Sequence, residues 1–211
     1  MTATDTASTR ETILDAAEEL FARRGFSATT IKQIAAGAGV NSALLYYYFD
    51  DKEALYRAVL GRLVEGLTAR AASRMADDGD PASAVRGFVE GQTEYLLAHP
   101  RMPRIVVREL LEHDAKHAEA VIAQTAAKGF ERLCGVIERG QKRGVFRRNI
   151  DARFAAISTI AQVVYVFIAR PAVGILLGHG PAGLPSDEIR RFGRHAAAFA
   201  IAALTPQAAS S

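Results

Sequence analysis

The chain has 211 residues, of which 49% are hydrophobic and 23% charged, and its formal net charge is +3. This composition is typical of a globular protein with a sizeable core and excludes a disordered chain. The N-terminal residues show no apolar run behind a basic start, so no signal peptide is predicted, and the single cysteine, Cys134, excludes an intrachain disulfide. Both observations are typical of a cytoplasmic protein.

The N-terminal part of the chain predicts a group of short helices. Residues 1–8 are small and polar, typical of a loose arm, and the apolar pattern that follows predicts a helix ended by Gly25. Thr30 and Gln33 have the spacing of a capping box at the start of a second helix. Gly39 then allows the chain to turn sharply, because glycine adopts left-handed backbone angles without a steric cost.

A third short helix follows this turn, because Asn41 is a favourable N-cap residue. Leu45 and Phe49 lie one turn apart and are expected to face inward. Two short helices joined by a glycine turn are the layout of a helix-turn-helix. The remaining residues of the third helix point away from the core and could enter the major groove of DNA: Ser42, Ala43, Leu44, Tyr46 and Tyr47.

The end of this helix and the residues after it carry a recognisable pattern. It reads Leu-Tyr-Tyr-Tyr-Phe at 45–49 and Asp-Lys-Glu-Ala-Leu at 51–55. The pattern resembles the signature of TetR-family transcriptional regulators, which usually reads Leu-Tyr-Tyr-His-Phe followed by Ser-Lys-Glu-x-Leu. Upstream residues also match, so the resemblance extends in register from about Thr9 to Leu60. It departs at Tyr48, where the family usually has histidine, and at the acidic pair at 50–51.

The resemblance implies a set of DNA contacts. Because no Arg or Gln points outward from the third helix, we expect much of the sequence specificity to come from DNA shape. The positions that family members use on base edges are occupied here by Lys32, Ser42, Ala43, Leu44 and Tyr46. Contacts to the phosphate backbone are expected from Thr29, Thr30, Tyr47, Tyr48 and Lys52.

The charge of residues 1–60 does not by itself favour DNA. Six basic residues stand against eight acidic ones, a net charge of −2, and the rest of the chain carries +5. The prediction of DNA binding therefore rests on motif geometry. The rival hypothesis is a helical small-molecule carrier or enzyme that does not read DNA.

The rest of the chain predicts further helices, so the predicted fold class is all-α. We expect a helix-turn-helix DNA-binding domain at 1–52 and a helical ligand-binding and dimerisation domain at 53–211. A linking helix is expected over about 52–75, then a break at 77–81 and helices over 82–99, 104–112, 115–143 and 186–204. Between the last two, Asp151 is expected to cap a helix whose residues 154–169 carry no charge.

The last two of these helices are strongly apolar. Burial in the protein's own core would explain this, but we favour a homodimer in which they form a four-helix bundle with the same helices of a second copy, as the resemblance implies. A membrane span is not expected, because the uncharged run over 154–169 is short and contains polar residues.

Helices after residue 81 offer side chains that could line a small-molecule site. We expect an apolar or aromatic effector with one or two polar contacts, although each of these side chains is more often a core residue. The candidates are Phe88, Tyr95, Met102, Val106, Glu109, His113, Phe130 and Tyr165.

His113 and His117 lie four residues apart beside Glu109, so one helical face could hold a divalent metal ion. A helix junction explains the same residues, and we predict neither a metal ion nor another cofactor. No nucleophile has an adjacent base, so we predict no enzyme activity. The combined prediction is a ligand-responsive regulator, most consistent with a repressor that a small molecule releases from a palindromic operator in double-stranded DNA.

Overall fold

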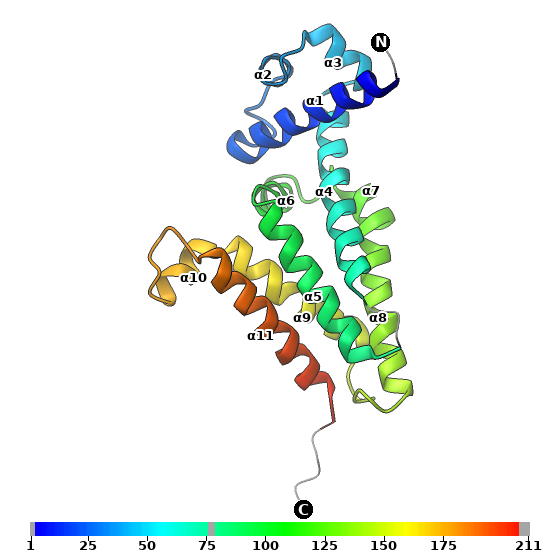
Figure 1. Cartoon of the computed structure of the whole chain (residues 1–211). Helices are drawn as coiled ribbons and strands as arrows, with labels where there is room; N and C mark the ends of the chain where they lie inside the picture. Colours follow the sequence, from blue (N-terminus) through cyan, green and yellow to red (C-terminus); the bar gives the residue numbers. More distant parts are fainter. Residues whose placement is uncertain (1–2, 76–78, 207–211) are drawn as a thin grey trace, which may run out of the picture. The chain divides into compact units, whose positions relative to one another are not determined.

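The computed structural model describes residues 3–75 and 79–206, with side chains from Ser8 onward (Figure 1). Every regular element in these ranges is helical, which confirms the all-α prediction. The prediction of a loose arm over residues 1–8 is wrong from Ala3 onward, because the first helix begins there. Residues 1–2 lie outside the described ranges.

Four helices precede the gap at residues 76–78. Helix α1 spans Ala3–Arg24 and ends at Gly25, whose φ is 79°. Helices α2 (Ile31–Gly37) and α3 (Ser42–Tyr48) are the two predicted short helices. Helix α4 spans Lys52–Arg74, and the Asp51 carboxylate caps it by accepting a hydrogen bond of 2.6 Å from the amide of Ala54.

Two of the helices after residues 76–78 begin at aspartate caps. The Asp80 carboxylate accepts from the amides of Ala82 and Ser83, and the Asp151 carboxylate accepts from the amides of Arg153 and Phe154. The elements are α5 (Pro81–Ala98), α6 (Met102–Glu112), α7 (Glu119–Val121), the π-helical segment η1 (Ile122–Ala126), α8 (Ala127–Lys142), α9 (Ala152–Ile168), α10 (Arg170–Leu176) and α11 (Ser186–Leu204).

Two segments differ from the predicted helices. The single helix expected over 115–143 begins only at Glu119 and contains the π-helical turn η1, because Asp114 and Ala115 have φ angles of 50° and 61° and form a turn instead. Helix α10 was not predicted. Helix α9 ends at Ile168, and Pro171 lies in the first turn of the new helix, where its missing N–H is tolerated.

The helices form two compact units. The first unit contains Met1–Val64 and Arg101–Ala123, and the second contains Glu65–Pro100 and Gln124–Ser211. Helix α4 therefore contributes residues to both units, and the first unit is built from two separate stretches of chain. The domain limits expected from the sequence, 1–52 and 53–211, stay a prediction.

Each unit has its own core. In the first, the apolar face of α1 is buried together with side chains of α2, α3 and α4; its fully buried members include Ile13, Leu14, Phe21, Ile34, Leu45, Leu55 and Tyr56. In the second, α5 packs against α8, α9 and α11. Small residues bring helices close there: a Cβ atom at Gly91 would lie 2.7 Å from the carbonyl oxygen of Arg70 on α4.

Within the described ranges, no single helix is both long and apolar enough to cross a membrane. Helices α9 and α10 meet that criterion only as a pair, and the chain bends by 84° between them.

Candidate nucleic-acid interface

The turn between α2 and α3 is fixed by local hydrogen bonds that the sequence encodes. The amide of Gln33 donates to the Thr30 hydroxyl at 3.3 Å, and the amide of Thr30 donates to the Gln33 side chain at 3.1 Å, which completes the predicted capping box. Gly39 has a φ of 67°. Asn41 caps α3, where its side chain accepts from the amide of Leu44 at 2.7 Å. The predicted helix-turn-helix is therefore present in full.

Helix α3 has one buried and one exposed face. Leu45 is fully buried and Phe49 is 5% exposed, so these two side chains hold the helix on the unit. Tyr46 and Tyr47 are 53% and 74% exposed, and Ala43 is exposed beside them. Exposed aromatic side chains of this size are uncommon on a helix whose other face is packed. This face of α3 is the part of the helix that can reach into a major groove.

The other predicted contact residues on α2 and α3 differ in their exposure. Lys32 and Thr30 are exposed, whereas Ser42 and Leu44 are half-buried. Tyr48 is half-buried and packs edge-on against Tyr47 with ring centroids 5.2 Å apart. Its hydroxyl oxygen is buried and has no hydrogen-bond partner. The hydroxyl that would replace the usual histidine therefore does not reach the surface in this conformation.

Two predicted phosphate contacts have structural partners inside the unit. Thr29 is fully buried, and its hydroxyl donates to the carbonyl oxygen of Gly25 at 2.8 Å. The Lys52 ammonium donates to the carbonyl oxygens of Phe26 at 3.0 Å and Thr29 at 3.1 Å, and it lies 4.2 Å from the centre of the Phe26 ring. Lys52 thus ties the first turn of α4 to the loop before α2, and an ammonium has three N–H groups, so one remains for another partner.

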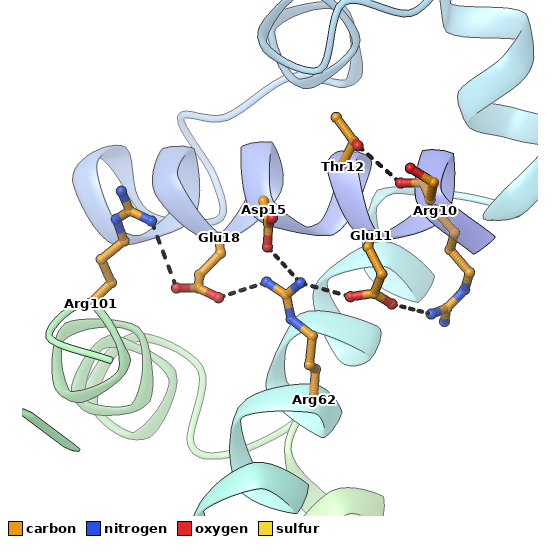
Figure 2. A network of polar contacts seen from close by, with 8 residues as sticks. Arg10, Glu11, Thr12, Asp15, Glu18, Arg62 and Arg101 are labelled. Carbon is orange, nitrogen blue, oxygen red and sulfur yellow. Dashed lines mark hydrogen bonds and ion pairs between the residues drawn. The ribbon is translucent and has the colours of Figure 1, made fainter. Parts of the chain in front are cut away.

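The acidic residues of the first unit are concentrated on one arginine of α4. Figure 2 shows Arg62 between the carboxylates of Glu11, Asp15 and Glu18 on α1. The three hydrogen bonds measure 3.1, 2.7 and 2.7 Å, and Arg101 lies 3.9 Å from Glu18. Three of the eight acidic residues in the N-terminal stretch are thereby used between α1 and α4. Arg62 and Arg101 offset two of these three negative charges, so most of this acidic charge is taken up inside the unit.

Arg62 itself is affected by this arrangement. Partial burial lowers the pKa of its guanidinium, but the hydrogen bonds that it donates to Asp15, Glu11 and Glu18 outweigh burial, and the pKa is raised above its ordinary value. Glu18 has only 9% of its side chain exposed. The charged pair is therefore a fixed part of the packing between α1 and α4.

The sequence also matches known families and proteins. Residues 13–59 match the family described as bacterial regulatory proteins, tetR family, and residues 81–191 match the tetracyclin repressor-like C-terminal domain. The HTH-type transcriptional repressor NicS of Pseudomonas putida is 34% identical over 161 residues, which is 75% of each chain. The HTH-type transcriptional repressor SCO4008 of Streptomyces coelicolor is 29% identical over 196 residues, 92% of this chain and 97% of that protein.

The chain belongs to the TetR family. Its fold is similar to that of solved family members, including KstR2 of Mycobacterium tuberculosis, with a TM-score of 0.71, 23% identity and coverage of 94% of this chain and 95% of that one. The TetR regulator PfmR from Thermus thermophilus gives the same TM-score at 22% identity, covering 92% and 99% of the two chains. The protein is accordingly a DNA-binding transcriptional regulator of the ligand-responsive repressor type.

In this TetR regulator, the eight residues predicted to line the effector site do not come together in one compact unit. Met102, Val106, Glu109 and His113 belong to the first unit, and Phe88, Tyr95, Phe130 and Tyr165 belong to the second. Phe88 is 5% exposed and lies in the core, whereas Tyr165 is 60% exposed on α9. Whether the others contact an effector stays a prediction.

The second unit has surface cavities with other linings. One, of about 140 Å³, lies between α5 and α11 and is lined by Glu90, Thr93, Glu94, Arg190, Gly193 and Arg194. Another, of about 410 Å³, is lined by Glu138, Gln141, Lys142 and Arg148. Most of the residues that line these two cavities are polar or charged in type, and neither cavity contains a residue that we predicted.

Arg62 and Phe26 are the functional residues of the TetR module that the sequence pattern did not single out. Arg62 meets partners that lie between 44 and 51 residues away in the sequence, so no local spacing signals the contact. The carbonyl oxygen and the ring of Phe26 both contact Lys52. A lysine after an aromatic-rich helix gives no indication that its partner lies 26 residues upstream.

Proposed function

We propose that α3 enters the major groove of an operator, with Tyr46 and Ala43 facing base edges and Lys32 reaching a base from α2. Tyr47 and Thr30 are placed to contact phosphates. The observation that carries this proposal is the exposure of Tyr46 and Tyr47, 53% and 74%, on a helix anchored by Leu45. A phenol can donate to a base edge or a phosphate while its ring packs on a thymine methyl group.

The buried predicted residues take supporting roles in this proposal. Thr29 positions the loop before α2 because its hydroxyl is bonded to Gly25. Lys52 sets the start of α4 against the same loop, and its remaining N–H can reach a phosphate. Ser42 and Leu44 contact the DNA where the major groove lies closest to α3. Tyr48 contacts a phosphate only if its ring turns outward.

We infer that the protein acts as a homodimer through α9 and α11. Large apolar side chains are exposed along one face of α9 at the spacing of a helix stripe: Phe154, Ile157, Tyr165 and Ile168. Phe199 is 58% exposed on α11. Such a stripe on each of two copies is buried by two-fold symmetric packing. The dimer then presents two copies of α3 to half-sites about one helical turn apart, which makes the operator an inverted repeat.

We propose that the effector is a small molecule with apolar or aromatic surface that binds within the second unit. Half-buried Tyr95, stacked on His99 with ring centroids 4.0 Å apart, and half-buried Phe130 support an aromatic contact. Effector binding favours a dimer in which the two copies of α3 no longer match both half-sites, so the operator is released. The protein would act in the cytoplasm, where its operator is.

The DNA contacts are tested by selecting bound sequences from a random double-stranded pool. We expect the wild-type protein to enrich an inverted repeat. Tyr47→Phe should bind the same repeat about tenfold more weakly, because it loses a phosphate contact. Tyr46→Ala should change the bases that are enriched, because Tyr46 faces base edges.

Tyr165→Phe is the control, because it removes the hydroxyl of an exposed tyrosine of the second unit and keeps the ring that the proposed dimer interface would bury. It should bind like the wild type. Enrichment of the same sequence with the same affinity by all three variants would contradict the proposed interface. A protein that binds no DNA at low salt, or whose affinity does not fall as salt rises, would instead be the carrier or enzyme of the rival hypothesis.

The dimer is tested by light scattering on a gel-filtration column. Phe199→Asp places a charge in the proposed interface and should give a monomer that no longer binds the inverted repeat with high affinity. Val145→Asp is the control, because Val145 is 37% exposed in the loop after α8 and should leave the dimer intact. A wild-type monomer, or a Phe199→Asp dimer, would rule out this interface.

A further inference from the structure

Three potential metal ligands meet in the first unit below the helix-turn-helix. They are Glu109 and the two histidines His113 and His117, which lie at the end of α6 and in the turn that follows. One oxygen or nitrogen atom from each lies within 4.8 Å of the corresponding atoms of the other two. Glu109 is 1% exposed and His117 is 5% exposed, so this is not a cluster of surface carboxylates.

The turn after α6 brings the three side chains together. Helix α6 ends at Glu112, and Asp114 and Ala115 then take φ angles of 50° and 61°, which reverse the chain. The amides of His117 and Ala118 both donate to Glu109 Oε1, at 2.6 and 3.2 Å. The other carboxylate oxygen, Oε2, lies 3.1 Å from Nδ1 of His117.

A hydrogen-bonded helix junction accounts for Glu109 and His117 but not for His113. The Glu109 carboxylate accepts from two amides and lies 3.1 Å from Nδ1 of His117, so it is satisfied. Nε2 of His113 is buried and has no hydrogen-bond partner. A buried polar nitrogen without a partner is destabilising and calls for an explanation.

A metal ion supplies that explanation. Two imidazoles and one carboxylate are a ligand set of zinc and of other first-row transition ions, and an ion would neutralise the buried charge of Glu109. In this structure the Glu109 carboxylate lies against Nδ1 of His117, so an ion bound by both groups would replace that hydrogen bond. Ligand atoms up to 4.8 Å apart are more than about an ångström farther apart than tetrahedral metal–nitrogen bonds of about 2.0–2.1 Å allow. His113 is half-buried, so its side chain has room to move that distance.

We propose that Glu109, His113 and His117 bind one divalent first-row transition ion per chain, with zinc as the best-suited ion and a water or another small ligand in the fourth position. This reverses the sequence-based prediction of no metal, because the spacing of two histidines could not reveal the unpaired nitrogen or the turn that gathers the ligands. The site is separate from the proposed DNA contacts and from the proposed effector site of the second unit.

The surroundings of the site suggest what the ion would control. The Phe26 ring lies 5.6 Å from the His113 ring and 4.7 Å from the His117 ring, measured between centroids. Tyr56 of α4 packs on His117 with ring centroids 5.4 Å apart. Phe26 also accepts from Lys52 through its carbonyl. An ion would therefore stiffen the loop that leads into α2 and the first turns of α4, so its occupancy would modulate operator affinity.

The test is titration of zinc into the metal-depleted, tag-free full-length protein, followed by calorimetry and, with cobalt, by absorption spectroscopy. We expect one zinc ion per chain with a Kd of about 1 µM or tighter. His113→Gln should weaken binding by at least about tenfold, and His117→Asn should do the same. The control is His179→Gln, because His179 is exposed in the loop after α10 and should leave zinc binding unchanged.

His113→Gln is the informative variant, because its Nε2 has no hydrogen bond to lose and the fold should be kept. Circular dichroism of each metal-free variant checks this. X-ray absorption at the zinc edge of the wild type needs no variant and should show two imidazoles and a carboxylate oxygen. Absence of stoichiometric binding, retention of binding in His113→Gln, or a sulfur ligand to zinc would each overturn the proposal.

Discussion

The contacts inside the first compact unit differ in kind from those inside the second. In the first, the buried ionisable side chains are paired: Glu18 with Arg62 and Glu109 with His117. In the second, the buried polar side chains among the described residues are uncharged, namely Gln92, Thr93 and Thr159. The second unit instead relies on close approach of helices at glycines.

This difference suits the two units to different tasks. Hydrogen-bonded ion pairs are directional, so they confine the angle between α1 and α4 and hold the helix-turn-helix in one geometry. Helices that meet through small residues gain dispersion contacts over a broad area without fixing a particular polar geometry. Mutations that remove a charge should therefore act mainly in the first unit, and mutations that add volume mainly in the second.

The largest effect is expected from Gly87→Ala in the second unit. The new Cβ atom would overlap the carbonyl oxygen of Arg74, which is backbone and cannot turn away, so we expect a loss of about 3 kcal/mol in the free energy of unfolding. Urea denaturation at matched protein concentration measures it. Gly135→Ala is the control, because a Cβ there meets only the end of the Arg139 side chain, and it should be neutral or slightly stabilising.

A smaller loss is expected when the charge balance of the first unit is broken. Arg62→Met keeps most of the side-chain volume but leaves the nearly buried Glu18 without its partner, and we expect a loss of about 2–3 kcal/mol by the same measurement. Arg57→Met removes the exposed pair with Glu53 and should change stability by less than about 0.5 kcal/mol. Equal losses of unfolding free energy for the two variants would show that the contacts of Arg62 stabilise the protein no more than an exposed ion pair does.

Gly39→Ala should show that a glycine of the first unit is needed for its backbone angle and not for space. Its φ is 67°, and no atom would lie within 4 Å of an added Cβ, so we expect a loss of about 1 kcal/mol from left-handed strain alone. Gly39→Asn should be better tolerated, because asparagine adopts this conformation more readily. If both replacements were equally harmful, steric crowding rather than the backbone angle would be responsible.

The smallest effect concerns the surface ion pairs of the second unit. Hydrogen bonds from Arg74, and then from Arg70, lower the pKa of Glu94 below its usual value despite some desolvation. A lowered folded-state pKa stabilises the protein above the unfolded pKa of about 4.3, and this stabilisation is lost as pH falls through the folded pKa. Glu94→Gln should therefore be less stable than the wild type by about 0.5 kcal/mol at pH 7, after allowance for solvent screening.

Thermal melts of both proteins between pH 7 and pH 3 test this. The difference between wild type and Glu94→Gln should shrink as the pH falls. A difference that grows toward low pH would mean that the carboxylate is more stable protonated, and that its pKa is raised in the folded state.

The sequence predicted the parts of the fold that depend on neighbouring residues. Thr30, Asn41 and Asp151 were recognised as caps because each bonds amides two or three residues ahead. Leu45 and Phe49 were assigned to the buried face of α3 from helical spacing, and both are buried.

What the sequence missed depends on distant contacts. The turn at Asp114 and Ala115 carries no glycine signal and is held by the Glu109 carboxylate, whose amide donors lie eight and nine residues away. Thr29 and Lys52 were assigned to phosphate by position in the pattern, but the pattern does not show that their polar atoms have partners inside the unit. Family resemblance supplies the position of a residue, whereas its direction depends on tertiary packing.

The first unit is not a continuous N-terminal segment, because Arg101–Ala123 belongs to it together with Met1–Val64. A chimeric regulator made by joining residues 1–75 to another effector domain would leave behind Arg101, which faces Glu18, and the two histidines that pack on Phe26. The transferred N-terminal helices would then pack against the α6 of another protein. Exchange of DNA-binding units between family members should succeed more often when the segment Arg101–Ala123 is moved together with the N-terminal helices.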